Sequence, residues 1–324
     1  MFLIWLHILL LMCFGYQVEA QEGSTAGTGG GGFVSGGYTL LSREAPWHVG
    51  IYSKTPKFYR HICGGTVIAK NAVLTAAHCF SADRNIPPAS NFAVAGGKTF
   101  SNWNETLNVG NQKSDVLKIH IPPRYQGSVA NFQDDIAIAI LAKPFTINEF
   151  VEPACLNFNP EFDAYQLRDG QLGKVVGWGF TDSQGTLSSF LQAAILPSIP
   201  IAKCIEQSPP GFRSSITGDK ICAGYSNGTA VCPGDSGGGL VFAYISKNHR
   251  RNYLHGIVST SPTSNDKCNV YTWATFTHVI RHEHFIKSIV PDVEQYCVTQ
   301  NLNNPGESKF SSSPNVKICH CPCE

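Results

Sequence analysis

The chain has 324 residues, 43% of them hydrophobic and 15% charged, which is long enough for one large domain or two small ones with a well-buried core. Its formal net charge is +1, from 24 Lys and Arg against 23 Asp and Glu, and this balance argues against nucleic acid or an anionic membrane surface as a partner. Function must therefore be sought in local motifs.

The first segment of the chain is apolar. Residues 1–14 read MFLIWLHILLLMCF, and Ala20 then offers the small residue that signal peptidase accepts. We predict a signal peptide over residues 1–20 and a secreted, extracellular protein, although the segment lacks a basic start. A membrane anchor is the alternative, but the apolar run is shorter than the roughly 20 residues that cross a bilayer.

A glycine-rich stretch follows at residues 21–33, which read QEGSTAGTGGGGF. Ordering so many glycines would cost backbone entropy that no side chain offsets, so we expect a flexible pro-segment. The chain has 12 cysteines, and eleven remain once Cys13 leaves with the signal peptide. This density indicates an oxidising compartment, and the odd number leaves one thiol free, joined to another chain or lost by trimming.

Residues 34–290 consist of short runs of β-branched and aromatic residues separated by Gly, Pro, Asn and Asp. Examples are TVIA at 66–69, AVA at 93–95, KVVGW at 174–178 and LHGIV at 254–258. Many short strands with such turns predict an all-β sandwich or a pair of barrels. Apolar residues at helical spacing from Phe276 to Ile289 predict one helix near the end of this domain.

The last segment, residues 291–324, is polar and ends in CHCPCE. We expect a cysteine-containing, largely disordered tail that disulfides tether. Residues 319–323 could also chelate zinc, but a secreted tail favours disulfides, so no metal or other cofactor is expected. Asn104 and Asn227 begin N-glycosylation sequons that we place on surface loops, with unmodified surface asparagine as the alternative.

Three motifs bring together the residue types of nucleophilic catalysis. They are TAAHC at 75–79, DIAIA at 135–139 and GDSGGGL at 234–240, in the order His, Asp, Ser. A serine hydroxyl needs a base within hydrogen-bonding reach and a buried carboxylate to orient that base. The motifs and their order resemble the chymotrypsin-like serine proteases over residues 34–290, and the resemblance implies two six-stranded antiparallel β-barrels with the active site between them and a C-terminal helix.

The resemblance assigns roles to individual residues. His78 would be the general base, Asp135 would orient its imidazole, and Ser236 would be the nucleophile. We select Asp135 over its neighbour Asp134 because the family's aspartate directly precedes an Ile-Ala-Leu-like strand. The N–H groups of Gly234 and Ser236 would form the oxyanion hole. An inactive protease-like scaffold is the alternative, although all three catalytic residues are present.

Cysteine positions fit the same family. The resemblance implies the disulfides Cys63–Cys79, Cys204–Cys222 and Cys232–Cys268. Cys155 occupies the position at which two-chain members of the family tie the catalytic domain to an N-terminal segment. Because residues 21–33 contain no cysteine, we expect Cys155 to pair with Cys297 or with a tail cysteine.

The resemblance also implies activation by cleavage. Val34-Ser35-Gly36-Gly37 takes the place of the family's Ile-Val-Gly-Gly, so cleavage would fall after Phe33, and the new N-terminus at Val34 would pair with Asp235. A one-residue shift of this site is possible. The alternative is that no processing occurs, but Asp235 would then be a buried carboxylate without a partner.

The resemblance also implies which residues bind the substrate side chain: Ala230, Val231 and Ala274 at the pocket, with Ser259 and Ser261 beside its entrance. Trypsin-like enzymes carry an aspartate at the first of these positions, and an uncharged floor cannot favour Lys or Arg. Small apolar walls fit an aromatic or medium aliphatic residue before the scissile bond, and the enzyme could therefore activate itself. A Thr in place of the usual Trp after Ser259, and a long loop beyond it, leave the other subsites open.

Within the family, the run NYLHGIVS at 252–259, the three glycines after Ser236 and the Cys155 position look most similar to insect modular serine proteases of haemolymph. This likeness favours limited proteolysis in an extracellular, immune-type cascade. Its partners would be protein substrates, among them a downstream protease zymogen, and a protein inhibitor. A digestive chymotrypsin-like protease and a non-catalytic binding homologue are the alternatives.

Overall fold

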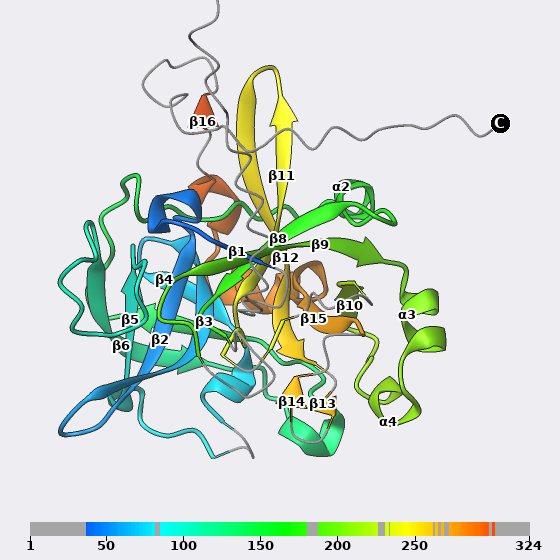
Figure 1. Cartoon of the computed structure of the whole chain (residues 1–324), viewed down its shortest axis with the longest axis horizontal. Helices are drawn as coiled ribbons and strands as arrows, with labels where there is room; N and C mark the ends of the chain where they lie inside the picture. Colours follow the sequence, from blue (N-terminus) through cyan, green and yellow to red (C-terminus); the bar gives the residue numbers. More distant parts are fainter. Residues whose placement is uncertain are drawn as a thin grey trace, which may run out of the picture. The chain divides into compact units, whose positions relative to one another are not determined.

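A computed structural model gives the fold of the chain (Figure 1). It describes residues 37–81, 85–179, 187–225, 231–232, 234–261, 263–264, 267–268, 272–297 and 300–301. Several predictions fall outside the described residues, namely the signal peptide, the pro-segment with Phe33, the new N-terminus at Val34, Asn227, Ala230 and most of the tail.

The first barrel is closed by six antiparallel strands in the order β2-β3-β4-β7-β6-β5, and β5 pairs back onto β2. These strands are β2 (His48–Lys54), β3 (Tyr59–Ala69), β4 (Ala72–Thr75), β5 (Phe92–Gly96), β6 (Gln112–His120) and β7 (Ala137–Leu141). Successive side chains of a strand face opposite sides, so alternate apolar residues can share one interior. Val49, Ile51, Val67, Val73 and Val94 are fully buried in one such cluster.

The second barrel is closed in the order β8-β9-β10-β15-β12-β11, and β11 pairs back onto β8. Its strands are β8 (Leu172–Gly177), β9 (Gln192–Ile199), β10 (Lys220–Ala223), β11 (Gly239–Ser246), β12 (His249–Thr260) and β15 (Ala274–His278). Val175, Leu196, Leu240, Phe242 and Phe276 fill its apolar cluster. The hairpin of β11 and β12 extends away from the rest of the barrel (Figure 1).

A third apolar cluster joins the two barrels. Ile68 and Ile138 of the first barrel pack in it with Val176 and Ile257 of the second. Because burial of apolar area drives folding, this shared core holds the barrels side by side. The predicted fold class, two six-stranded antiparallel β-barrels with a C-terminal helix, is confirmed.

Short elements connect and extend the barrels. The remaining strands are β1 (Tyr38–Thr39), which pairs with β9, β16 (Gln300–Asn301), which pairs with β12, and the hairpin of β13 (Thr263–Ser264) and β14 (Lys267–Cys268). The helices are α2 (Pro160–Gln166), α3 (Ile201–Gln207), α4 (Pro210–Arg213) and α5 (Glu283–Ile289), with 3-10 turns η1 (Ser42–Glu44), η2 (Ala77–Cys79), η3 (Ala89–Asn91), η4 (Gly127–Ala130), η5 (Val279–His282) and η6 (Val293–Tyr296). No helix in the described part of the chain combines the length and apolarity needed to cross a membrane.

The C-terminal helix begins later than its apolar periodicity predicts. Phe276, which we expected in the helix, lies in β15 between Ile221 of β10 and Val258 of β12. Pairing on both sides makes it a central strand residue, and such long-range pairing outweighs local periodicity. The α-helix starts only at Glu283, and Ile286 buries its apolar face in the core shared by the barrels.

Part of the predicted tail is folded. Cys297 forms a disulfide with Cys155, and η6 just before it buries Val293, which is 1% exposed. Farther on, β16 pairs with the start of β12, where His249 and Arg250 are its partners. Residues 291–297 and 300–301 therefore pack on the described domain, and the rest of the segment lies outside the described residues.

A buried carboxylate fixes α2 to the second barrel. Asp163 Oδ1 lies 2.8 Å from His255 Nδ1 of β12, and its Oδ2 lies 2.8 Å from His278 Nε2 of β15. Burial raises the pKa of Asp163, but hydrogen bonds from the two imidazoles outweigh it, and the pKa lies well below its usual value. The carboxylate thus ties one helix to two neighbouring strands.

We predict that Asp163→Asn lowers the free energy of unfolding by about 2–3 kcal/mol, because an amide nitrogen would face one of the two imidazole donors. The depressed pKa means that the stabilisation by Asp163 is present above its unfolded pKa of about 4 and is lost as the pH falls below it. Urea unfolding from pH 3 to pH 7 measures both effects. The idea fails if the variant shows the same decline below about pH 4 as the parent protein.

Candidate active site

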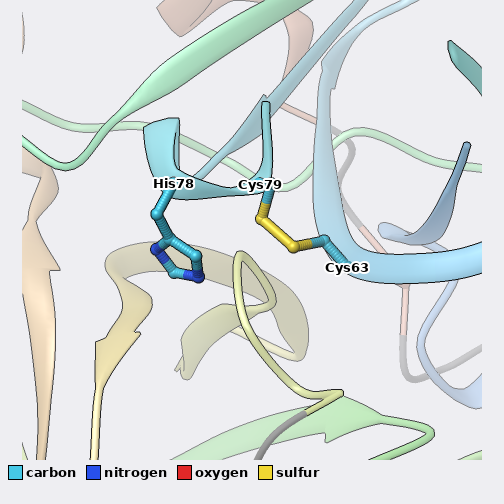
Figure 2. A group of neighbouring side chains, drawn as sticks. All are labelled: Cys63, His78 and Cys79. Atoms are coloured by element: carbon cyan, nitrogen blue, oxygen red, sulfur yellow. A yellow bond between two sulfur atoms is a disulfide. The ribbon is translucent and has the colours of Figure 1, made fainter. Parts of the chain in front are cut away.

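His78 is held by a buried aspartate at two points. It lies on η2, directly after β4, and its neighbour Cys79 is joined to Cys63 (Figure 2). Its Nδ1 lies 2.8 Å from Asp135 Oδ2, and its backbone N–H donates to Asp135 Oδ1 over 2.9 Å. Both the ring and the main chain of the histidine are therefore positioned by one carboxylate.

Asp135 lies two residues before the start of β7 and is 0% exposed. The hydroxyl of Ser259 on β12 donates to its Oδ2 over 2.6 Å, and the hydroxyl of Thr277 on β15 donates to its carbonyl oxygen over 2.8 Å. Burial raises the pKa of Asp135, but the charge and hydrogen bond of His78 and the other donors outweigh it, and the pKa is lowered. The same pairing raises the pKa of His78 despite its burial.

The neighbouring Asp134 points elsewhere. Its carboxylate lies 3.2 Å from Arg124 Nε, and its backbone N–H donates to Asp219 Oδ2 over 2.9 Å. The structure therefore brings Asp135, the residue selected from the sequence, to His78, and gives Asp134 a place in a separate charged group.

Ser236 lies in a turn shaped by glycines. Gly234 has φ +101° and Gly237 has φ +76°, a region of backbone conformation that favours glycine. A side chain at Gly237 would run into Thr75 Oγ1 and come within 3.1 Å of Cys79 Sγ, so the turn packs directly against the segment that carries His78. The carbonyl oxygen of Ser236 accepts a hydrogen bond from Gly64 of β3 over 2.8 Å.

The N–H groups of this turn are available to a ligand. In the described part of the chain, neither Gly234 N–H nor Ser236 N–H has an acceptor, and no hydrogen bond joins the Ser236 hydroxyl to His78. Two neighbouring N–H groups without an acceptor are what an oxyanion site requires. The serine and histidine segments are thus brought together through backbone packing.

Asp235, between these two residues, is 0% exposed. Its Oδ1 accepts from Gly179 N–H over 2.9 Å, and its Oδ2 accepts from Cys232 N–H over 3.0 Å. Burial raises the pKa of Asp235 to about 6, against the effect of these two hydrogen bonds. No cationic side chain of the described residues forms an ion pair with it.

The predicted pocket residues lie in different surroundings. Val231 is 0% exposed and Ala274 is 2% exposed, and both belong to the apolar cluster of the second barrel. Ser261 is half-buried, whereas the hydroxyl of Ser259 is committed to Asp135. Sequence reasoning placed Ser259 at the pocket and missed this contact, because the partner is 124 positions away in the chain.

The disulfides Cys63–Cys79 and Cys204–Cys222, which the family resemblance implied, are both present. Cys232 is also disulfide-bonded, while the side chain of its expected partner Cys268 lies outside the described residues. Cys63, Cys79 and His78 lie close enough together to suggest a metal site. The two sulfur atoms are bonded to each other (Figure 2), so they offer no thiolates to a metal.

The segments that carry His78, Asp135 and Ser236 therefore pack together where the two β-barrels meet. The profile of the family described as trypsin matches residues 34–280, which is most of the chain. The chain therefore belongs to the trypsin family of serine proteases.

Three relatives illustrate the likeness. The chain is 29% identical to modular serine protease of Drosophila melanogaster over 262 residues, 33% identical to clotting factor C of Tachypleus tridentatus over 258, and 33% identical to melanization protease 1 of Drosophila melanogaster over 275. The matches cover 78%, 76% and 79% of this chain. They cover 40%, 24% and 65% of the relatives, so the chain spans less than half the length of the first two.

We predict that Gly237→Ala destabilises the protein by about 3 kcal/mol or more, because the new methyl group meets the backbone carbonyl of Gly64 at 2.6 Å as well as Thr75. Gly170→Ala is the matched control, since Gly170 has φ +75° but no atom within 4 Å of an added Cβ. Backbone strain alone should cost the control about 1 kcal/mol. Equal losses of unfolding free energy in the two variants would contradict the packing argument.

Proposed function

We propose that the protein is a serine endopeptidase in which Ser236, His78 and Asp135 carry out the chemistry. This proposal depends on the two hydrogen bonds by which Asp135 positions His78, one to the imidazole ring and one to the backbone N–H. The glycine-rich turn that carries Ser236 packs against the same segment. Ser236 Oγ attacks the peptide carbonyl carbon while His78 Nε2 takes its proton. His78 then gives the proton to the leaving amine, and water repeats both steps on the acyl-enzyme.

The oxyanion of each tetrahedral intermediate is held by the N–H groups of Gly234 and Ser236. Donors fixed in advance stabilise charge that develops only in the transition state, and one such donor is worth about a hundredfold or more in rate. Asp135 keeps the correct tautomer of His78 and stabilises the imidazolium that forms. The lowered pKa of Asp135 supports this role, since the carboxylate stays ionised throughout.

The protein is made as a zymogen in this proposal. Removal of the signal peptide and cleavage after Phe33 expose the ammonium group of Val34, which pairs with Asp235. Support comes from the carboxylate itself, which is fully buried and receives only two backbone N–H donors from the described residues. A buried carboxylate in such surroundings is costly to ionise, and a cation beside it removes that cost.

This proposal predicts a pH signature of the uncleaved protein. Because burial raises the pKa of Asp235 to about 6 from 3.8, its ionisation destabilises the fold as the pH rises from about 4 to above 6. Thermal unfolding of the uncleaved protein across this range should show the loss. Asp235→Asn and the protein cleaved after Phe33 should both lack it, and a cleaved protein that keeps the full loss would argue against the ammonium pair.

The substrate specificity that we propose is for aromatic or medium aliphatic residues before the scissile bond. The apolar burial of Val231 and Ala274 supports an uncharged pocket together with the sequence at Ala230. Phe33 is itself such a residue, which supports self-activation. Secretion is supported by the disulfides and by Asn104, which lies exposed in a turn and is open to glycosylation.

Limited proteolysis in an extracellular cascade is the role that the relatives favour. Clotting and melanization appear in the names of two of them, and the Cys155–Cys297 disulfide adds a covalent tie that a simple digestive enzyme does not need. The natural partners would be protein substrates such as a downstream zymogen, and a protein inhibitor. A binding homologue without catalysis remains the second candidate, because relatives near 30% identity do not fix activity.

The deciding experiment incubates the purified zymogen with peptides that carry Phe, Leu or Arg before the scissile bond, and sequences every new N-terminus. We expect cleavage after Phe or Leu about tenfold or more faster than after Arg, with Val34 exposed. Ser236→Ala should reduce the rate about a thousandfold or more. Cleavage after Arg would overturn the proposed pocket, and no cleavage once Val34 is exposed by an added protease would point to the binding homologue.

A further inference from the structure

A buried lysine lies behind the proposed catalytic residues. Lys220 begins β10 and is 4% exposed. Its Nζ donates to the carbonyl oxygen of Phe132 over 2.7 Å and to Thr277 Oγ1 over 3.0 Å, and it lies 3.7 Å from Asp219 Oδ2. A buried ammonium group is costly unless its hydrogen bonds and charge are matched, and this one has three partners.

The segment that Lys220 contacts has an unusual backbone. Asn131, Phe132 and Asp134 have φ values of 51°, 57° and 56°, a left-handed region that costs non-glycine residues about 1 kcal/mol or more each. Such a conformation persists only when surrounding contacts fix it. Lys220 binds the carbonyl of Phe132, and Asp219, beside Lys220, accepts the N–H of Asp134.

Two residues of the 131–135 segment, Phe132 and Asp135, contact His78. The ring of Phe132 packs edge-on against the imidazole, with centroids 6.1 Å apart, and Asp135 holds its Nδ1. Lys220 reaches the first residue directly and the second through Thr277, whose hydroxyl donates to the carbonyl oxygen of Asp135. One ammonium group therefore connects to both neighbours of the histidine.

Further charged and titratable side chains lie beyond Lys220. Beyond Asp219 lies His282, with Nε2 3.5 Å from Asp219 Oδ2 and Nδ1 3.8 Å from Asp134 Oδ1, and Arg124 closes the series at Asp134. Asp134, Asp219 and His282 are close enough to suggest a metal site, but the ring nitrogens face different carboxylates and each carboxylate already has a cation. We therefore interpret the group as an ion network.

We propose that Lys220 is a positioning residue of the proposed active site, whose ammonium group holds the 131–135 segment and adds a positive charge near the Asp135–His78 pair. This inference rests on the proposed function. The charge of Lys220 lowers the pKa of both Asp135 and His78. Asp135 raises the pKa of His78, and the charge of Lys220 opposes this increase. The histidine is therefore neutral, and able to accept a proton, at a lower pH than it would be without Lys220.

The test compares pH profiles of kcat/KM for Lys220→Met, Lys220→Arg and Thr277→Val in the activated protein. We expect Lys220→Met to shift the acidic limb of the kcat/KM profile to higher pH by about half a pH unit and to lower the maximal kcat/KM about tenfold. Lys220→Arg keeps the charge and should keep the limb, while Thr277→Val should lower the plateau without moving the limb. Lys174→Met, a half-buried lysine of β8, is the control that should change neither.

A second readout does not require activity. In a Ser236→Ala background, NMR titration of the labelled His78 ring should show a higher pKa once Lys220→Met is added. This result supports the inference even if the parent protein proves inactive, which would count against the proposed function alone. The inference is wrong if Lys220→Met changes neither the pKa of His78 nor the acidic limb of the kcat/KM profile. If that variant fails to fold, the inference is wrong if Thr277→Val keeps the maximal kcat/KM of the parent protein.

Discussion

The arrangement of the site depends on one buried carboxylate. Asp135 belongs to the first barrel, and His78 contacts both oxygens of its carboxylate. Two further donors lie on strands of the second barrel: Ser259 donates to the carboxylate, and Thr277 donates to the backbone carbonyl of Asp135. An ionised group without access to water is tolerated only when every oxygen is hydrogen-bonded. The barrels can therefore satisfy Asp135 only in one relative placement, and the same requirement that stabilises their junction also orients the imidazole.

Other carboxylates are also buried in this fold, and each offsets the free-energy cost of burying a charge in a different way. Burial raises the pKa of Asp163 and Asp219, but nearby partners outweigh it, and the pKa of both lies below its usual value. These partners are two imidazoles for Asp163, and His282, Lys220, Thr217 and a backbone N–H for Asp219. Asp235 has backbone donors alone among the described residues, and its pKa is raised. Asp163 and Asp219 therefore stabilise the fold as it stands, whereas the Asp235 carboxylate would gain stability from a cation that a conformational change brings close.

Much of this could be read from the sequence, because the chemistry is written in short local motifs. The strand-rich pattern predicted a sandwich or a pair of barrels, and the family resemblance then implied two barrels and favoured Asp135 over Asp134 as the partner of His78. What could not be read depends on distant pairing. Phe276 follows a helical period but is held as a strand by neighbours on both sides, and Lys220 reads as an ordinary surface lysine until β10 is placed against β15. The contact of Lys220 with Thr277 spans 57 positions, and no local pattern records it.

The Cys155–Cys297 disulfide closes a loop of 142 positions that contains every strand of the second barrel. A peptide bond broken anywhere inside that loop leaves the two pieces covalently attached. The loop includes Ser236, whereas His78 and Asp135 precede it, so a nicked molecule would still carry its serine-bearing half on the same covalent unit as its histidine-bearing half. A protein cleaved inside this loop therefore keeps the apparent size of the intact chain under non-reducing conditions and separates into two pieces only after the disulfide is reduced.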